Sequence, residues 1–369
     1  MKMKLAILCL LFAAAAIHAA DAPAADAKTP SAFAPADHYQ VTVIGDIHFD
    51  DAEFHNAPAI NPGRQKERER NFAMWQDASR KLLETAAKQT AGTSAFVIQL
   101  GDITQGDCDT PELQEGLLRK AFETVKSYFP NLPLLVVKGN HDVRVFRTQN
   151  NSAPFRSTML PLVAGELGMD VPANGCFAVR KGKDLFLSID SMMPKSRIVP
   201  FVRKALDDAP DCRYVIALMH LPLFPCSVNP SFWLLPGYEE VTDLLETRRA
   251  VVLAAHTHTF SLFRRKSEKA TLVQLITTSM GNAWNPGGTL KVRAVMDDVL
   301  TQWSKTRHGE RTRKQIEDLM SRGGTYSGTI YEPKSGFTVL DIDDRRIEAR
   351  IFTDDSGKPV LTEVLVENH

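Results

Sequence analysis

The segment VVLAAHTHTF, residues 251–260, joins a continuous run of apolar and small residues to two histidines, His256 and His258. Short apolar runs rich in branched residues are typical of strands buried on both faces of a sheet. Residues two apart in an extended chain point to the same side, so the two imidazoles can face one site. The segment therefore predicts a buried strand that ends at a pair of metal-competent side chains.

The same pattern occurs in other parts of the chain and predicts a sheet built mainly from parallel strands. Apolar positions recur at helical spacing in residues 67–88, and again between Thr110, a helix cap, and Pro130. Alternation of strands and helices is typical of parallel sheets with right-handed crossovers. The predicted strands are VTVI (41–44), AFVIQL (95–100), PLLVV (133–137), YVIALM (214–219) and AVVLAA (250–255).

Polar side chains follow every one of these five runs. Carboxyl ends of parallel strands lie along one edge of a sheet, where ligands bind. One such residue has ordinary explanations, such as a turn-forming Asp or a hydrogen-bonded His, but burying all of them unpaired would cost several kcal/mol. Imidazole, carboxylate and amide ligands together favour manganese, iron or zinc over calcium. The seven metal-competent residues are Asp46, His48, Asp102, Asn140, His220, His256 and His258.

The order of these residues resembles the calcineurin-like metallophosphoesterases. The matching motifs are GDIH (45–48), GD (101–102), GNHD (139–142), the single His220 and AHTH (255–258). The resemblance implies an α/β fold, in which two mixed β-sheets pack as a sandwich flanked by helices in four layers. It also implies a dinuclear metal site at the carboxyl ends of the strands. The implied activity is hydrolysis of a phosphomonoester or phosphodiester, with a metal-bridging hydroxide as nucleophile.

The resemblance further assigns roles to the individual residues. His141, whose neighbour Asn140 would face the metal, is expected to face the substrate phosphate as general acid or charge stabiliser. The cofactors would be two divalent ions, with manganese, iron or zinc expected. One ion would be held by Asp46, His48 and His258, the other by Asn140, His220 and His256, with Asp102 bridging both.

The chain departs from parts of the family in the run GDITQGD, residues 101–107. Many protein phosphatases of the family have Asp where Gln105 stands, and purple acid phosphatases need a Tyr there, so neither activity is favoured. The acid that orients His141 would be Asp142 or Asp107, or would be absent. Ala255 replaces the usual Gly of the last motif, a small change that we expect to be tolerated.

Two other classes of function compete with a phosphoesterase. A catalytically inactive metallophosphoesterase-like binding protein is the main alternative, while an amidohydrolase is disfavoured because that class begins with His-x-His. Residues 143–176, 221–238 and 281–335 could form the walls around a substrate. The side chains considered for gripping it are Phe155, Arg156, Trp233 and Trp284, although packing or surface exposure is the commoner role of such residues.

The beginning of the chain predicts export. Residues 1–20 carry Lys2 and Lys4 before an apolar run that is shorter than the roughly 20 residues of a membrane span, which favours a cleaved signal peptide over an anchor. Residues 21–38 are rich in Ala, Pro and Asp and predict a disordered leader. A periplasmic or secreted location follows, in which Cys108, Cys176, Cys212 and Cys226 could either form disulfides or stay free thiols.

The rest of the chain, residues 39–369, is expected to be one metallophosphoesterase catalytic domain. Residues 281–335 would form a helical insertion or cap, with an apolar stripe over 290–303, before a closing C-terminal hairpin at 337–352. Lys plus Arg and Asp plus Glu both number 44. Without a basic field, polymeric nucleic acid is not expected as a partner, and a small phosphate ester is. The oligomeric state stays open.

Overall fold

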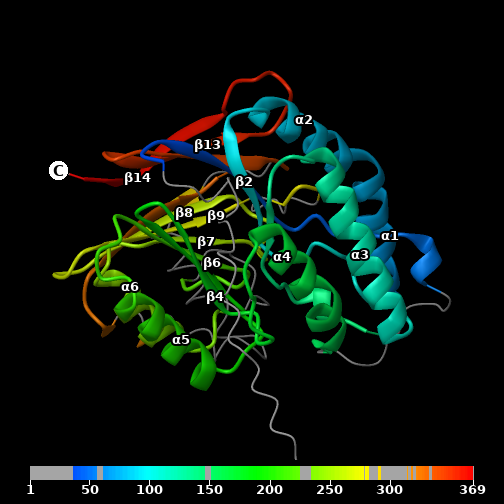
Figure 1. Ribbon diagram of the computed structural model, residues 1–369, viewed down its shortest axis with the longest axis horizontal. Coiled ribbons are helices and arrows are strands. Elements are labelled where there is room, and N and C mark those ends of the chain that lie inside the picture. Colours follow the sequence, from blue (N-terminus) through cyan, green and yellow to red (C-terminus); the bar gives the residue numbers. More distant parts are fainter. Residues whose placement is uncertain are drawn as a thin grey trace, which may run out of the picture.

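Two mixed β-sheets pack against each other, and helices lie behind one of the sheets and at one side of the sandwich (Figure 1). The computed structural model describes residues 36–55, 61–145, 151–224, 234–277, 279–281, 290–291, 314, 317–318, 321–331 and 335–368. The six-stranded sheet has the order β14 (Leu361–Glu367), β13 (Arg346–Phe352), β12 (Phe337–Ile342), β1 (Tyr39–Ile44), β2 (Ser94–Gln99) and β3 (Leu134–Val136). This architecture confirms the predicted sandwich of two mixed sheets.

The second sheet has eight strands, and its central pairs β5–β6, β6–β7 and β7–β9 are parallel. Its order is β10 (Leu290–Lys291), β11 (Thr325–Ile330), β8 (Ser261–Lys266), β9 (Thr271–Ile276), β7 (Val251–Ala254), β6 (Val215–Met219), β5 (Asp184–Ile189) and β4 (Phe177–Lys181). In the first sheet β1, β2 and β3 are mutually parallel. The five predicted strands are therefore divided between two sheets, and the single sheet edge inferred from their apolar runs is wrong.

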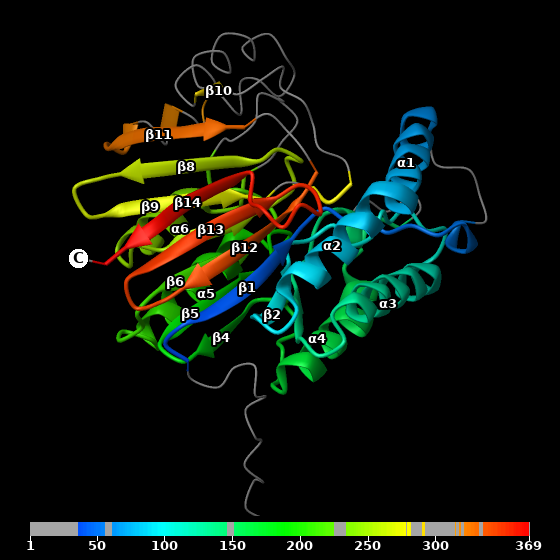
Figure 2. The ribbon, with the colours of Figure 1, turned by 90° about the horizontal axis from the view of Figure 1, so that it is seen from above.

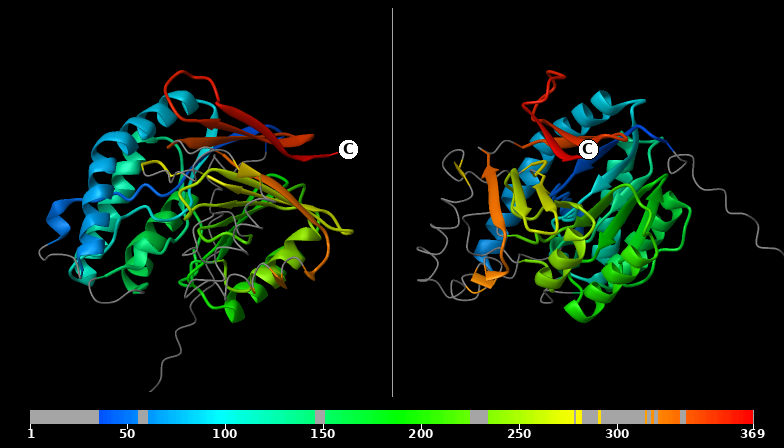
Figure 3. Two further views of the ribbon diagram at one scale, coloured as in Figure 1. Left: turned by 180° about the vertical axis from the view of Figure 1, so that it is seen from behind. Right: turned by 90° about the vertical axis from the view of Figure 1, so that its left-hand side faces the viewer.

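Strand β6 shows why these runs are apolar throughout. Ile216 and Leu218 belong to the core between the sheets, whereas Val215, Ala217 and Met219 belong to a second core on the opposite face. That second core includes buried residues of α5 (Lys195–Asp207) and α6 (Tyr238–Glu246). Both views in Figure 3 place these green helices on the far side of the eight-stranded sheet from the red C-terminal strands.

The other helices lie together at one side of the sandwich (Figure 2). They are α1 (Pro62–Met74), α2 (Arg80–Thr90), α3 (Pro111–Tyr128) and α4 (Leu160–Leu167), and a π-helical segment, Trp75–Ser79, joins α1 to α2. The side chain of Thr110 accepts a hydrogen bond from the Leu113 amide, and Pro111 occupies the first turn of α3, as the sequence predicts. In the described parts of the chain, no helix combines the length and apolarity needed to cross a membrane.

Several predicted segments lie wholly or partly outside the described residues. The signal peptide and most of the leader do so, as does most of the predicted apolar stripe at 290–303. Within 281–335, residues Thr325–Ile330 form β11, which pairs with β8 as part of the sheet. The predicted hairpin at 337–352 is formed by β12 and β13, and β14 adds a third strand. Cys108, Cys176 and Cys212 are free thiols, while Cys226 is not described.

Candidate metal centre

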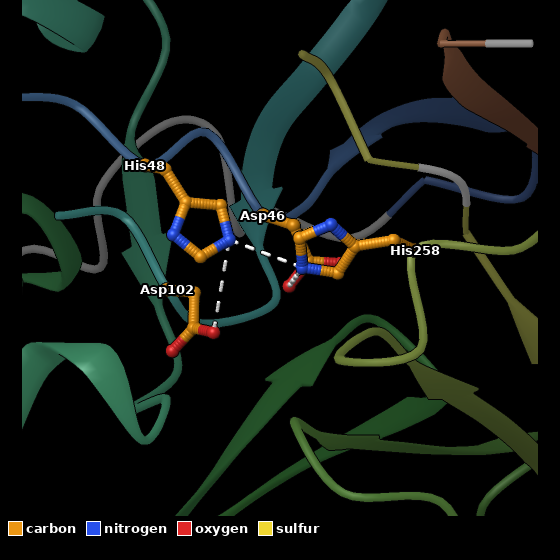
Figure 4. A group of neighbouring side chains, drawn as sticks. All are labelled: Asp46, His48, Asp102 and His258. Atoms are coloured by element: carbon orange, nitrogen blue, oxygen red, sulfur yellow. Dashed lines mark hydrogen bonds and ion pairs between the residues drawn. The ribbon is translucent and has the colours of Figure 1, made fainter. Parts of the chain in front are cut away.

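The polar residues that follow the buried strands meet where the two sheets come together. Asp46, His48, Asp102 and His258 each offer one ligand atom, and these atoms lie within 4.8 Å of one another. Nε2 of His48 is 3.1 Å from Nε2 of His258 and 3.9 Å from Oδ2 of Asp102. Figure 4 shows the two imidazoles directed toward each other, with the two carboxylates beside them.

A second group of ligand atoms includes the same aspartate. Asp102, His220 and His256 offer atoms within 4.8 Å of one another. Nε2 of His220 lies 3.3 Å from Asp102 Oδ2 and 3.2 Å from His256 Nδ1. The side-chain oxygen of Asn140 is 3.1 Å from the same His220 nitrogen. The seven predicted residues thus form two adjoining groups with Asp102 in common, and their assignment as ligands stays a prediction.

The chemistry of these groups fits divalent metal ions. Nδ1 of His220 lies 2.9 Å from the Leu100 carbonyl oxygen, which requires Nδ1 to carry a hydrogen and directs Nε2 toward the group. Apposed imidazole nitrogens such as those of His48 and His258 can share only one hydrogen. A buried set of nitrogen and carboxylate ligands that converge in this way is typical of manganese, iron or zinc sites.

Burial and neighbouring charges shift the pKa values of these side chains. Burial lowers the pKa of the His48 and His256 imidazoles well below the ordinary value, so both are neutral and able to bind metal. Burial also acts against charge on His220, but the Asp102 carboxylate outweighs it and the pKa rises to about 9. A metal at His220 would therefore displace a proton. Burial raises the pKa of Asp102, yet His220 and His141 hold it well below its usual range.

Tight backbone contacts hold Asp102 in place. Its amide donates to Oδ2 of Asp142 at 3.0 Å, and the Gly139 amide donates to the same oxygen at 2.8 Å. Oδ1 of Asp142 accepts from the amide of Thr104 at 3.0 Å. A Cβ atom at Gly139 would lie only 2.1 Å from the Asp102 nitrogen. A glycine is thus required where the turn after β3 approaches the loop after β2.

His141 lies beside the metal groups but turns its ring differently from their members. Its amide donates to Oδ1 of Asp102 at 2.7 Å, and its ring centre is 4.5 Å from that of His48. Nδ1 lies 2.8 Å from the backbone carbonyl oxygen of Gln105. That carbonyl orients the ring, whereas Asp142 binds the loop after β2 and Asp107 pairs with Arg64 and Arg144. Neither of the two acids proposed from the sequence holds the His141 ring.

Three further residues contact the centre, and none of them was predicted from the sequence. Nη1 of Arg144 lies 2.5 Å from Nε2 of His141, and Nη2 donates to Glu67 of α1 at 2.8 Å. The Ser279 hydroxyl donates to the backbone oxygen of Asp46 at 2.9 Å. Arg144 follows the GNHD motif by two residues, and this position is the one feature of the sequence that could have suggested a role for it. Glu67 lies among many charged residues of its helix, so composition does not distinguish it.

The candidate substrate-gripping residues have different positions. Phe155 is buried in the core between the sheets and their flanking helices, so it packs and is not exposed to a ligand. Arg156, the next residue in the sequence, is exposed to solvent. Trp233 and Trp284 lie outside the described residues.

The sequence of residues 39–260 matches the family model of the calcineurin-like phosphoesterases. That match covers more than half of the chain, which therefore belongs to this family of metal-dependent phosphoesterases. No curated protein matches the sequence.

Solved structures with the same fold include a dimetal phosphatase. A dimetal phosphatase from Danio rerio aligns over 89% of this chain and 99% of its own, with a TM-score of 0.52 and 14% identity. PhoD aligns over 92% of this chain and 74% of its own, with a TM-score of 0.53 and 9% identity. GAP50, described as the anchor in the inner membrane complex of Plasmodium, aligns over 90% of both chains, with a TM-score of 0.50 and 10% identity. At these identities the likeness concerns the fold.

Proposed function

We propose that the protein is a secreted or periplasmic hydrolase of small phosphate esters that works with two divalent metal ions. The observation that carries this proposal is the sharing of Asp102 between two adjoining groups of ligand atoms. A carboxylate in that position can bridge two ions, and paired ions are used by many enzymes that act on phosphate esters. Family membership supports the same chemistry.

Each metal would be held by a set of nitrogen and oxygen atoms. When bound, the pair of ions would supply an activated water and neutralise charge on the phosphoryl oxygens. Manganese, iron or zinc suits these ligands. The first ion would take Asp46, His48 and His258, the second Asn140, His220 and His256, and both would take Asp102.

The chain itself would orient the substrate through His141. Its Nδ1 hydrogen is directed to the Gln105 carbonyl, so Nε2 would have to carry a second proton in order to donate to a substrate oxygen. Nε2 lies 4.0 Å from Oδ2 of Asp102. A phosphoryl group bound to metal ions at Asp102 would thus be within reach of His141. His141 would then act as general acid or charge stabiliser.

The test is turnover of a panel of phosphomonoesters and phosphodiesters by the metal-stripped protein and after addition of manganese, zinc or iron. We expect negligible turnover without metal and at least about 100-fold recovery with one of the ions, since both ions act on the reacting group. Full turnover by the stripped protein would contradict the proposal. His141→Ala separates an enzyme from an inactive, metal-holding relative, because it should lose turnover while keeping its metal content.

Export is a separate part of the proposal and rests on the N-terminal residues. Lys2 and Lys4 before the apolar run support a signal peptide, as set out above. Expression of the full chain with a C-terminal tag, followed by cell fractionation and mass spectrometry of the N-terminus, tests it. A tagged protein that keeps residue 1 and stays in the cytoplasm would contradict export without affecting the proposed hydrolysis.

A further inference from the structure

Four charged side chains form a compact cluster beside His141. Arg64 and Glu67 come from α1, Asp107 from the loop after β2, and Arg144 from the turn after β3; we refer to these four as the α1 charge cluster. Nη2 of Arg144 lies 2.8 Å from Oε2 of Glu67 and 3.2 Å from Oδ2 of Asp107. Asp107 also pairs with Arg64. Two carboxylates therefore fix the position of the Arg144 guanidinium.

The Arg144 guanidinium lies against the His141 ring, which would face a substrate. Nη1 of Arg144 lies 2.5 Å from Nε2 and 2.6 Å from Nδ1, so it contacts the ring beside both nitrogens. Because Nδ1 donates to the Gln105 carbonyl, Nε2 is the ring nitrogen that can accept a hydrogen bond. Any group that approaches Nε2 from the metal groups therefore also meets Arg144.

Two hydrogen-bond donors at or next to the α1 charge cluster are buried without an acceptor among the described residues. Arg144 is 9% exposed, and its Nε atom is buried without a hydrogen-bond partner among the described residues. The same is true of Nε2 of Gln105, the residue whose backbone holds His141. Buried donors without acceptors are unfavourable, and an arginine carries five of them. A ligand rich in oxygen atoms at this corner would satisfy donors that the protein leaves unpaired.

The backbone around the cluster is closely packed and holds Arg144 in place. The Asp107 amide donates to the Arg144 carbonyl oxygen at 2.6 Å. A Cβ atom at Gly106, where φ is +69°, would lie 2.2 Å from the His141 carbonyl oxygen. A guanidinium fixed in this way presents a planar fork of donors, which matches the oxygens of a phosphate.

We propose that Arg144 is a substrate-binding residue, whose guanidinium binds a phosphoryl oxygen on the His141 side of the metal groups. Glu67 and Asp107 act as positioning residues, because they hold the guanidinium without reaching the phosphate themselves. The inference rests on the proposed function, since it places the phosphate at the shared aspartate. The inference assigns phosphate binding to a residue, Arg144, that is not one of the predicted metal-binding residues.

The test compares Arg144→Met and Arg144→Gln with the wild-type protein, all as the full mature chain loaded with the same metal. Inorganic phosphate is the probe, and its affinity is measured by calorimetry and by product inhibition of p-nitrophenyl phosphate hydrolysis. We expect phosphate affinity to fall and KM to rise by about tenfold or more, as for loss of a charge-assisted hydrogen bond. Metal content should stay unchanged, and Glu67→Gln should have a smaller effect of the same sign.

Arg264→Met is the matched control, because Arg264 of β8 also pairs with a carboxylate, that of Glu363, but lies outside the α1 charge cluster. It should leave phosphate affinity unchanged. Arg144→Gln keeps a polar group for Glu67 and Asp107, and it decides the question if Arg144→Met does not fold. A folded, metal-loaded Arg144 variant with wild-type phosphate affinity and KM, and only a lower kcat or Tm, would overturn the inference. A wild-type protein that neither binds nor releases phosphate would instead refute the proposed function.

Discussion

Several residues of the metal centre have an unusual backbone conformation. Asp46, His48, Asp102, His256 and His258 all have φ between 46° and 70°, in the left-handed region. This conformation costs a residue other than glycine about 1 kcal/mol or more, and it persists where the surroundings enforce it. The same backbone turns bring side chains from separate strands to one point. Positioning of these side chains therefore lowers the stability of the fold.

Asp142 can be tested at this scale because it accepts hydrogen bonds from three backbone amides, those of Asp102, Thr104 and Gly139. Burial raises the pKa of this carboxyl to about 6, so it is ionised at pH 7.5. In Asp142→Asn the new amide group would face donors, which should lower the free energy of unfolding by about 1–3 kcal/mol. Urea denaturation at pH 7.5 measures the change.

The control for this substitution is Asp341→Asn, which removes a partly exposed carboxylate that contacts His38, Gln40 and Arg350 at the surface. We expect it to change the free energy of unfolding by less than about 1 kcal/mol. Equal stability of the two variants would show that the buried carboxylate of Asp142 does not hold the loop after β2.

The spacing of the motifs was sufficient to predict which residues would gather at the centre. Each candidate directly follows an apolar run, so its place at a strand end can be read from the sequence. The contact between Arg144 and Glu67 could not be predicted, because the two residues are 77 positions apart and neither follows a periodic pattern. The contact between the Gln105 carbonyl and the His141 ring could not be predicted from the sequence either, because it depends on the backbone conformation and not on the residue type.

At the scale of elements, the turn after β3 and the loop after β2 depend on a close approach of their backbones. In Gly139→Ala the new Cβ would lie 2.1 Å from the nitrogen and 2.2 Å from Oδ1 of Asp102, so one of the two segments must move. A displacement of about 1 Å at a reacting centre can lower the rate by about 100-fold. We expect a loss of that size in kcat/KM, together with weaker metal binding measured by titration.

Gly165→Ala in α4 provides the comparison, because a Cβ atom there meets no other atom within 4 Å. Alanine favours a helix over glycine, so this variant should be as stable as the wild-type protein or more so. Undiminished turnover by Gly139→Ala would contradict the close packing of the two segments.

Elements with continuous apolar runs were predictable, and those with mixed composition were not. Strands β1, β2, β3, β6 and β7 follow from their composition, since their residues are almost all buried. β11 was missed because its sequence, TYSGTI, is exposed or half-exposed over its first four residues. Helix α5 was not predicted because it contains Pro200, and proline is unfavourable inside a helix. The division of the strands between two sheets depends on the pairing of β1 with β12, nearly 300 residues away.

For the molecule as a whole, the buried imidazoles predict how stability depends on pH in the metal-free protein. Burial lowers the pKa of His48, His141 and His256, so between pH 6.5 and 5 the unfolded state binds protons that the folded state does not. The free energy of unfolding should then decrease as the pH is lowered from 6.5 to 5, by up to about 1.4 kcal/mol per pH unit for each histidine. Two groups contribute the opposite slope: His220, with its pKa raised to about 9, above pH 6.5, and Asp142, with its pKa raised to about 6, below about pH 6.

Urea denaturation of the chelator-treated protein at several pH values between 5 and 8 measures these slopes. His256→Asn should reduce the fall between pH 6.5 and 5, because asparagine takes up no proton on unfolding. Equal pH dependence of the wild-type protein and His256→Asn through this range would contradict the burial of a neutral imidazole at His256.

The sharing of one aspartate by two groups of ligand atoms is tested most directly by the metal content of the protein after loading and gel filtration. Elemental analysis of the wild-type chain and of Asp102→Asn gives the number of ions bound per chain. We expect two ions for the wild-type protein and loss of both from Asp102→Asn, because each group loses its common carboxylate. A wild-type protein that binds a single ion, or an Asp102→Asn variant that keeps two, would contradict it.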